Sequence, residues 1–198
     1  MSSNTSRTEL HELCEFSLID HLTKDFSPKN SSTLIGVGDD AAVISPEGKQ
    51  VVVSTDLLLE GIHFDLTYNP LKHLGYKSVV VNLSDIYAMN ATPTQVTISI
   101  GVSKKFCLED LDEFYAGVKL ACERYGVDMV GGDTSASMTG LTISVTAIGI
   151  TSRENICYRS GAKENDLICV TGNLGAAYMG LKLLEREKQV FLSNSNAQ

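Results

Sequence analysis

Apolar residues recur along this chain with two spacings, one typical of helices and the other of buried strands. Helical spacing predicts helices over residues 8–24, 71–90 and 108–125. Segments rich in valine, isoleucine and threonine predict strands, which cover residues 34–35, 43–44, 51–58, 94–102, 127–130 and 141–150. Helices and strands therefore alternate, and this order predicts an α/β or α+β lobe.

The pattern changes near residues 151–160. Beyond them, residues 166–172 predict another strand, residues 176–187 predict the start of a helix, and the sequence closes in a polar tail. We therefore expect one lobe over residues 1–150. Residues 151–198 would form a linker and the beginning of a second, truncated lobe.

Composition and charge narrow the class of protein. The chain is 43% hydrophobic and 20% charged, as in ordinary globular proteins. No apolar run reaches membrane-spanning length, and the N-terminus lacks the features of a signal peptide. A net charge of −8 without a basic stripe disfavours nucleic acid as a partner. Five cysteines without CxxC spacing predict reduced thiols, with Cys14, Cys122 and Cys169 in the core, and a cytoplasmic location.

Isolated aspartates follow short apolar or glycine-containing segments at several places: Asp39 and Asp40, Asp56, Asp85 and Asp133. A carboxylate beside apolar residues needs water, a cation or a hydrogen-bond donor. Because carboxylate and hydroxyl oxygens suit Mg²⁺, the set predicts a divalent-metal site. Each aspartate also has a plainer interpretation, namely a solvated turn, a helix N-cap or a hydrogen-bonded structural residue.

Other motifs are less specific. Residues 36–41 fit the GxGxxA dinucleotide fingerprint, but two carboxylates would repel a pyrophosphate, and Pro46 and Gly48 prevent the helix that the fingerprint requires. Neither a Walker A motif nor HExxH occurs, and no His or Cys cluster has zinc spacing. His63 and Tyr115 have structural interpretations, and Arg159 is either a phosphate contact or an ordinary surface charge.

Six segments in order resemble thiamine-monophosphate kinase, in the superfamily of aminoimidazole ribonucleotide synthetase and selenophosphate synthetase. They are GVGDDAAVI, STDLLLEGIHF, VNLSDIYAM, FYAGVKLACE, VGGDTS and YRSGAKENDLICVTGNLGAA. The resemblance implies a first lobe with a mixed sheet flanked by helices, which joins the sheet of its twin across a homodimer. It also implies ATP-dependent phosphorylation of thiamine monophosphate to thiamine diphosphate. The γ-phosphoryl group would pass directly, with several Mg²⁺ ions and no covalent catalytic residue.

The resemblance also implies roles for single residues. The substrate contact would be His63, and the ATP contacts would be Tyr115, Gly132, Asp133 and Arg159. The magnesium ligands would be Asp40, Ser54, Thr55, Asp56, Asp85 and Asp133. The SDGL-like and GGEDY-like motifs of the family's second lobe do not occur in the sequence. Two alternatives therefore stay open: a catalytically incomplete dimerising lobe and a HypE-like ATP-dependent maturation enzyme.

Overall fold

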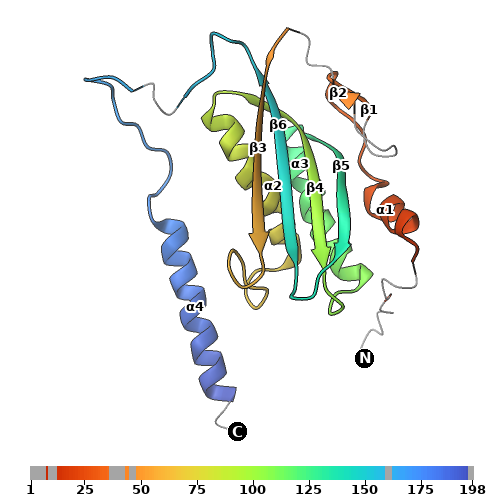
Figure 1. Ribbon diagram of the computed structural model, residues 1–198. Coiled ribbons are helices and arrows are strands. Elements are labelled where there is room, and N and C mark those ends of the chain that lie inside the picture. Colours follow the sequence, from red (N-terminus) through yellow and green to blue (C-terminus); the bar gives the residue numbers. More distant parts are fainter. Residues whose placement is uncertain (1–7, 9–12, 36–42, 45–47, 159–161, 196–198) are drawn as a thin grey trace.

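A four-stranded mixed sheet forms the centre of the protein (Figure 1). The computed structural model describes residues 8, 13–35, 43–44, 48–158 and 162–195. The strand order is β3 (Gln50–Leu59), β6 (Thr142–Thr151), β4 (Thr92–Val102), β5 (Asp128–Ala136). The β4 and β5 strands are parallel, whereas β6 is antiparallel to both β3 and β4. The predicted α/β lobe with a mixed sheet is confirmed.

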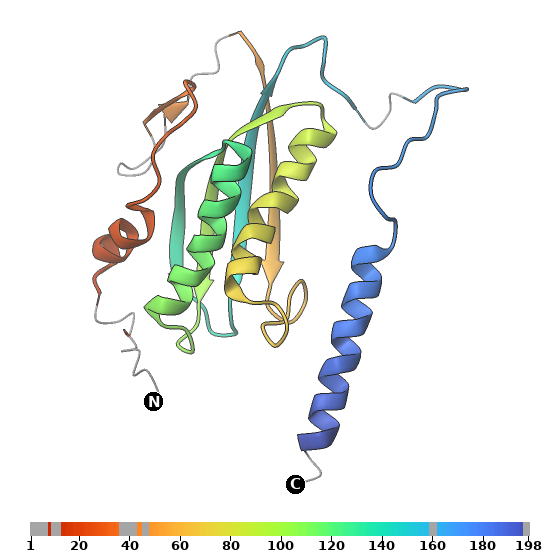
Figure 2. The same ribbon diagram turned by 180° about the vertical axis from the view of Figure 1, so that it is seen from behind.

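Two long helices cover one face of this sheet, and within the described ranges no helix covers the other, open face (Figure 1 and Figure 2). Figure 2 shows α2 (Leu71–Ala88) and α3 (Leu108–Tyr125) side by side across the covered face. The helices pack on the face to which β6 directs its buried apolar side chains. Ile143, Val145 and Ala147 are buried, while the residues between them are half-buried. The core then forms between these strands and the apolar sides of the helices, around Leu83 and Phe114.

The two helices approach closely because each presents a glycine to the other. A Cβ at Gly75 would stand 1.9 Å from the Phe114 carbonyl oxygen, and one at Gly117 would stand 1.9 Å from the Lys72 carbonyl oxygen. Helix α3 ends at Gly126, which adopts the left-handed conformation with φ 64°. Any side chain at the two contact positions would push the helices apart.

An N-terminal segment runs beside α3 and the β5 edge of the sheet (Figure 1). It contains α1 (Glu15–Thr23) and a two-stranded antiparallel hairpin, β1 (Thr33–Ile35) with β2 (Val43–Ile44). Buried Asp128 on β5 holds this segment. Its carboxylate accepts hydrogen bonds from the Lys29 N–H at 2.5 Å, the Asn30 N–H at 2.9 Å and the Thr33 hydroxyl at 2.7 Å.

The C-terminal part departs from the prediction. Helix α4 (Ala176–Ser195) forms as expected, but residues 166–172 are exposed and have no strand structure. A strand needs a hydrogen-bonded neighbour, and the described chain offers none there. The same exposure makes the prediction for Cys169 wrong. Cys14 is also exposed, and of the three cysteines expected in the core Cys122 is the buried one.

Helix α4 contacts the loop before α2 through Lys188, which pairs with Asp65. This bond is the main reason that the pKa of Asp65 is lowered to about 2, with a further contribution from Thr67. The apolar side chains of α4, such as Leu183 and Phe191, are largely exposed. Among the described residues, no helix combines the length and apolar character needed to cross a bilayer.

Candidate active site

Three of the predicted metal ligands lie between β3 and α2. The Ser54 hydroxyl donates a hydrogen bond of 2.7 Å to a carboxylate oxygen of Asp85, near the end of α2. Asp56 lies two residues further along β3, so its side chain is on the same face of the sheet as Ser54. Ser54 and Asp56 are half-buried and Asp85 is exposed. The fold thus gathers one hydroxyl and two carboxylates at the outer edge of the sheet, open to a ligand.

Thr55 is separated from this group by the alternation of the strand. Its hydroxyl lies on the open face, where it donates to the Val145 carbonyl at 3.1 Å and accepts from the Thr146 hydroxyl at 3.0 Å. The structure therefore does not bring the Thr55 hydroxyl to Ser54 and Asp56. The sequence grouped Thr55 with Ser54 and Asp56 because the three are consecutive, but neighbouring residues of a strand point to opposite faces.

Asp133 and Gly132 lie on β5, the opposite edge of the sheet. Asp133 is exposed and pairs in register with Ser99, on the open face. Gly132 has a packing role, because a Cβ there would stand 1.8 Å from the Ile98 carbonyl oxygen. Asp133 consequently belongs to a different edge and a different face from Asp56.

His63 lies in the turn that connects β3 to α2. Its backbone N–H donates to the Leu59 carbonyl at 2.9 Å, and the Leu59 N–H donates to its ring Nδ1 at 3.0 Å. The side chain is exposed. Since β3, β4 and β5 run in the same direction, His63, which follows the end of β3, lies at the same end of the sheet as the loops that follow β4 and β5.

Tyr115 is part of the core. It is 7% exposed and contacts Phe114 edge-to-face at a ring distance of 5.5 Å. Burial raises the pKa of Tyr115 to about 12. The contact with ATP that the resemblance implies for Tyr115 stays a prediction. Asp40 and Arg159 lie outside the described residues.

No three His, Cys, Asp or Glu side chains come together as a metal site within the described part of the chain. Among the predicted ligands, the Ser54 hydroxyl and the Asp85 carboxylate are joined by a hydrogen bond, and Asp56 follows on the same face of β3. This group lies on the part of the sheet where α2 rests against β3. Any cation bound there would need additional oxygens from a ligand, water or another segment.

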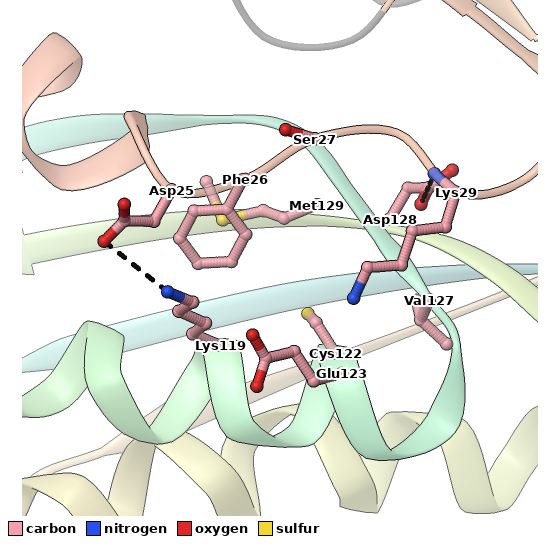
Figure 3. A pocket seen from close by; sticks show the side chains of 10 residues that line it. All are labelled: Asp25, Phe26, Ser27, Lys29, Lys119, Cys122, Glu123, Val127, Asp128 and Met129. Atoms are coloured by element: carbon pink, nitrogen blue, oxygen red, sulfur yellow. Dashed lines mark hydrogen bonds and ion pairs between the residues drawn. The ribbon is translucent and has the colours of Figure 1, made fainter.

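A shallow cavity of about 250 Å³ lies elsewhere, between the N-terminal segment, α3 and β5 (Figure 3). Phe26, Cys122 and Met129 form its apolar base, and Lys29 and Lys119 lie at its rim. None of the predicted site residues lines it. Asp128 also borders it and was missed by sequence reasoning. The available signal was a lone carboxylate inside an apolar strand, between Val127 and Met129.

The family model described as "AIR synthase related protein, N-terminal domain" matches residues 38–151, more than half of the sequence. The chain belongs to this family. The thiamine-monophosphate kinase of Bacillus subtilis is 37% identical over 174 residues, covering 87% of this chain and 53% of the relative. That of Aquifex aeolicus is 37% identical over 182 residues, covering 92% and 56%. The chain thus spans about half the length of the curated relatives that it matches.

Solved structures agree with this placement in the family. The thiamine-monophosphate kinase of Stenotrophomonas maltophilia superimposes with a TM-score of 0.75 at 33% identity, covering 88% of this chain and 54% of that one. AaThiL complexed with AMPPCP and TMP gives a TM-score of 0.67 at 37% identity, covering 93% and 56%. A hydrogenase maturation protein HypE, at 22% identity and a TM-score of 0.57, shares the fold.

Proposed function

We propose that this family member is the nucleotide- and metal-binding lobe of a thiamine-monophosphate kinase. In the assembled cytoplasmic enzyme, the γ-phosphoryl group of ATP would pass to thiamine monophosphate. The observation that carries the proposal is the grouping of Ser54, Asp56 and Asp85 at the edge of the sheet. Similarity to AaThiL, a structure that holds AMPPCP and TMP, supports the two substrates.

Magnesium fits the donors at this edge. All three are oxygen atoms, and neither carboxylate forms an ion pair with a lysine or arginine of the described ranges. Mg²⁺ is commonly held by one or two protein carboxylates together with the phosphates of its nucleotide, rather than by a complete protein cage. The small number of carboxylates here suits that arrangement. Asp40 is a further candidate ligand from the glycine–aspartate segment.

The proposed mechanism depends on position and charge more than on covalent chemistry. Bound magnesium would supply charge neutralisation for the phosphates. Asp56 and Asp85 would bind the magnesium that accompanies the nucleotide at the β3 edge. Ser54 orients Asp85 through its hydrogen bond. His63 contacts thiamine monophosphate at the end of the same strand. Direct transfer requires only that the donor and acceptor phosphates be aligned.

The open face of the sheet supports a homodimer as part of the proposal. It exposes Val51 by 49%, Val53 by 60% and Leu57 by 53%, in one row along β3. Thr55 lies between Val53 and Leu57 in this row, and the three exposed apolar side chains around it form a candidate interaction surface. A second copy packed on this face would bury the row. It would also enclose Asp133, which then serves the assembled dimer rather than the β3 site of its own chain.

Calorimetric titration with AMPPCP tests the proposal. We expect binding to require Mg²⁺ and to weaken about 10–100-fold in Asp56→Asn and in Asp85→Asn, because each loses a charged ligand. Asp20→Asn, an exposed aspartate on α1, is the matched control and should bind like the wild type. Binding that is independent of metal and equal in all three variants would sink the proposal.

A catalytically incomplete dimerising lobe is the second candidate, favoured by the half-length match to the kinases. Incubation of the 198-residue chain with Mg-ATP and thiamine monophosphate separates the two. Formation of thiamine diphosphate would reject the incomplete lobe. Metal-dependent binding of AMPPCP without any product would favour it. The HypE-like alternative rests on shared fold alone, because a HypE structure is 22% identical to this chain and HypE in complex with ATP is 21% identical.

A further inference from the structure

The ring of His63 has a defined hydrogen-bonding orientation. Because the Leu59 N–H donates to Nδ1 at 3.0 Å, Nδ1 acts as an acceptor and carries no proton. The neutral ring therefore carries its proton on Nε2. The exposed side of the ring presents an N–H donor to any molecule that approaches the end of β3.

Glu60 ties the turn that holds His63 to two other loops. Its carboxylate accepts the Leu141 N–H at 2.8 Å and pairs with Lys105. Its own N–H donates to the Leu141 carbonyl at 3.1 Å. Its carboxylate oxygen would lie only 2.6 Å from a Cβ at position 140, which is the glycine Gly140 with φ 127°. The Glu60 side chain is 19% exposed, so the pair with Lys105 is partly shielded from water.

Two further contacts restrain the same turn. Phe64, next to His63, is 6% exposed and belongs to the core. Lys77 on α2 donates to the His63 carbonyl at 3.3 Å. The contacts of Glu60 and Phe64, on either side of His63, restrain the backbone of the turn. They thereby fix the direction in which the His63 ring points.

We propose that Glu60 is a positioning residue for His63. By joining the turn to Leu141 and Lys105, it keeps the Leu59 N–H on Nδ1 and the Nε2–H directed outward. The Nε2–H then donates to a phosphate oxygen of thiamine monophosphate, and Lys77 adds positive charge at the same place. The identity of the ligand rests on the proposed function, whereas the link from Glu60 to His63 does not.

NMR of the ¹⁵N-labelled chain tests the link without any ligand. The wild type should show a scalar coupling between the Leu59 amide nitrogen and His63 Nδ1, and slow exchange of the Leu59 amide. Glu60→Ala should lose the coupling and exchange at least tenfold faster. Glu60→Gln should keep the coupling, because its amide oxygen still accepts from Leu141. A folded Glu60→Ala that keeps both signals would overturn the proposal.

Lys105→Met covers the case in which Glu60→Ala does not fold. Its site is exposed, with the lysine side chain at 51% exposure, so the fold should survive. Exposed Lys104 provides the matched control, Lys104→Met. Leu59 exchange that is faster in Lys105→Met than in Lys104→Met supports the link. Equal exchange in the two variants contradicts it.

Titration with thiamine monophosphate tests the role in binding. Glu60→Ala and His63→Ala should each weaken binding about tenfold, and Glu60→Gln should recover most of the affinity. Wild-type affinity in a Glu60→Ala chain that has lost the coupling would overturn the positioning role. If the wild type shows the coupling but binds no thiamine monophosphate, the proposed function fails while the link between Glu60 and His63 stands.

Discussion

Replacing Asp128 by alanine should destabilise the protein more than the same change at any other carboxylate that the structure describes. Asp128 is 3% exposed and receives hydrogen bonds from Lys29, Asn30 and Thr33. Gln95 extends the network, since its amide donates to the Thr33 hydroxyl at 2.7 Å. The alanine variant would leave the donors of Lys29, Asn30 and Thr33 without their common acceptor.

The size of the loss can be estimated from these contacts. A hydrogen bond to a charged group contributes about 1.5–3 kcal/mol, and the terms are not additive. Two effects reduce the sum: the buried charge is removed, and the partly exposed N–H groups at Lys29 and Asn30 can turn to water. We therefore expect a net loss of about 3 kcal/mol for Asp128→Ala. For Asp128→Asn, which keeps one acceptor oxygen, about 1–2 kcal/mol is expected.

Urea unfolding followed by circular dichroism measures these values. The matched control is Asp133→Asn in metal-free buffer, an exposed aspartate five positions along the same strand, which should change stability by less than about 0.5 kcal/mol. A loss below about 1 kcal/mol for Asp128→Ala, a value typical of surface changes, would refute the view that this carboxylate anchors the N-terminal segment.

Three further outcomes follow from contacts and from the shifts in pKa. Gly117→Ala should cost about 3 kcal/mol in thermal unfolding, because its Cβ would meet the backbone of α2, whereas Gly180→Ala on α4 meets open space and should cost nothing. The Thr8 N–H donates to the Glu109 carboxylate, and this hydrogen bond is the main reason that the pKa of Glu109 is lowered from 4.5 to about 2. The stabilising contribution of the ionised Glu109 is thus present above pH 4.5 and is lost as the pH falls through about 2. In urea titrations, Glu109→Gln should therefore lose less stability than the wild type between pH 7 and pH 2. Burial raises the pKa of Cys122 to about 12, so a thiol reagent at pH 8 should modify exposed Cys169 first; equal rates in the folded chain would contradict this.

The fold and one part of the site could be predicted from the sequence because they depend on local patterns. Apolar spacing located α2 and α3, and β-branched content located the sheet strands, although β5 continues to Ala136, beyond the predicted end at residue 130. Aspartates beside these segments led to Asp56 and Asp85, which the fold does bring to one edge of the sheet with Ser54. The strand expected at residues 166–172 was wrong, since its composition could not reveal that no neighbouring strand is present in the described chain.

The rest of the site could not be predicted because residue type does not encode the face or the order of strands. Asp56 on β3 and Asp133 on β5 are separated by β6 and β4. Three strand spacings of about 4.8 Å place them about 14 Å apart, on opposite faces of the sheet. Oxygens that share one Mg²⁺ ion lie about 2.1 Å from it, and therefore within about 4 Å of each other. A single chain folded in this way cannot use both aspartates on one ion, so they can act together only through separate ions or across a second copy of the chain.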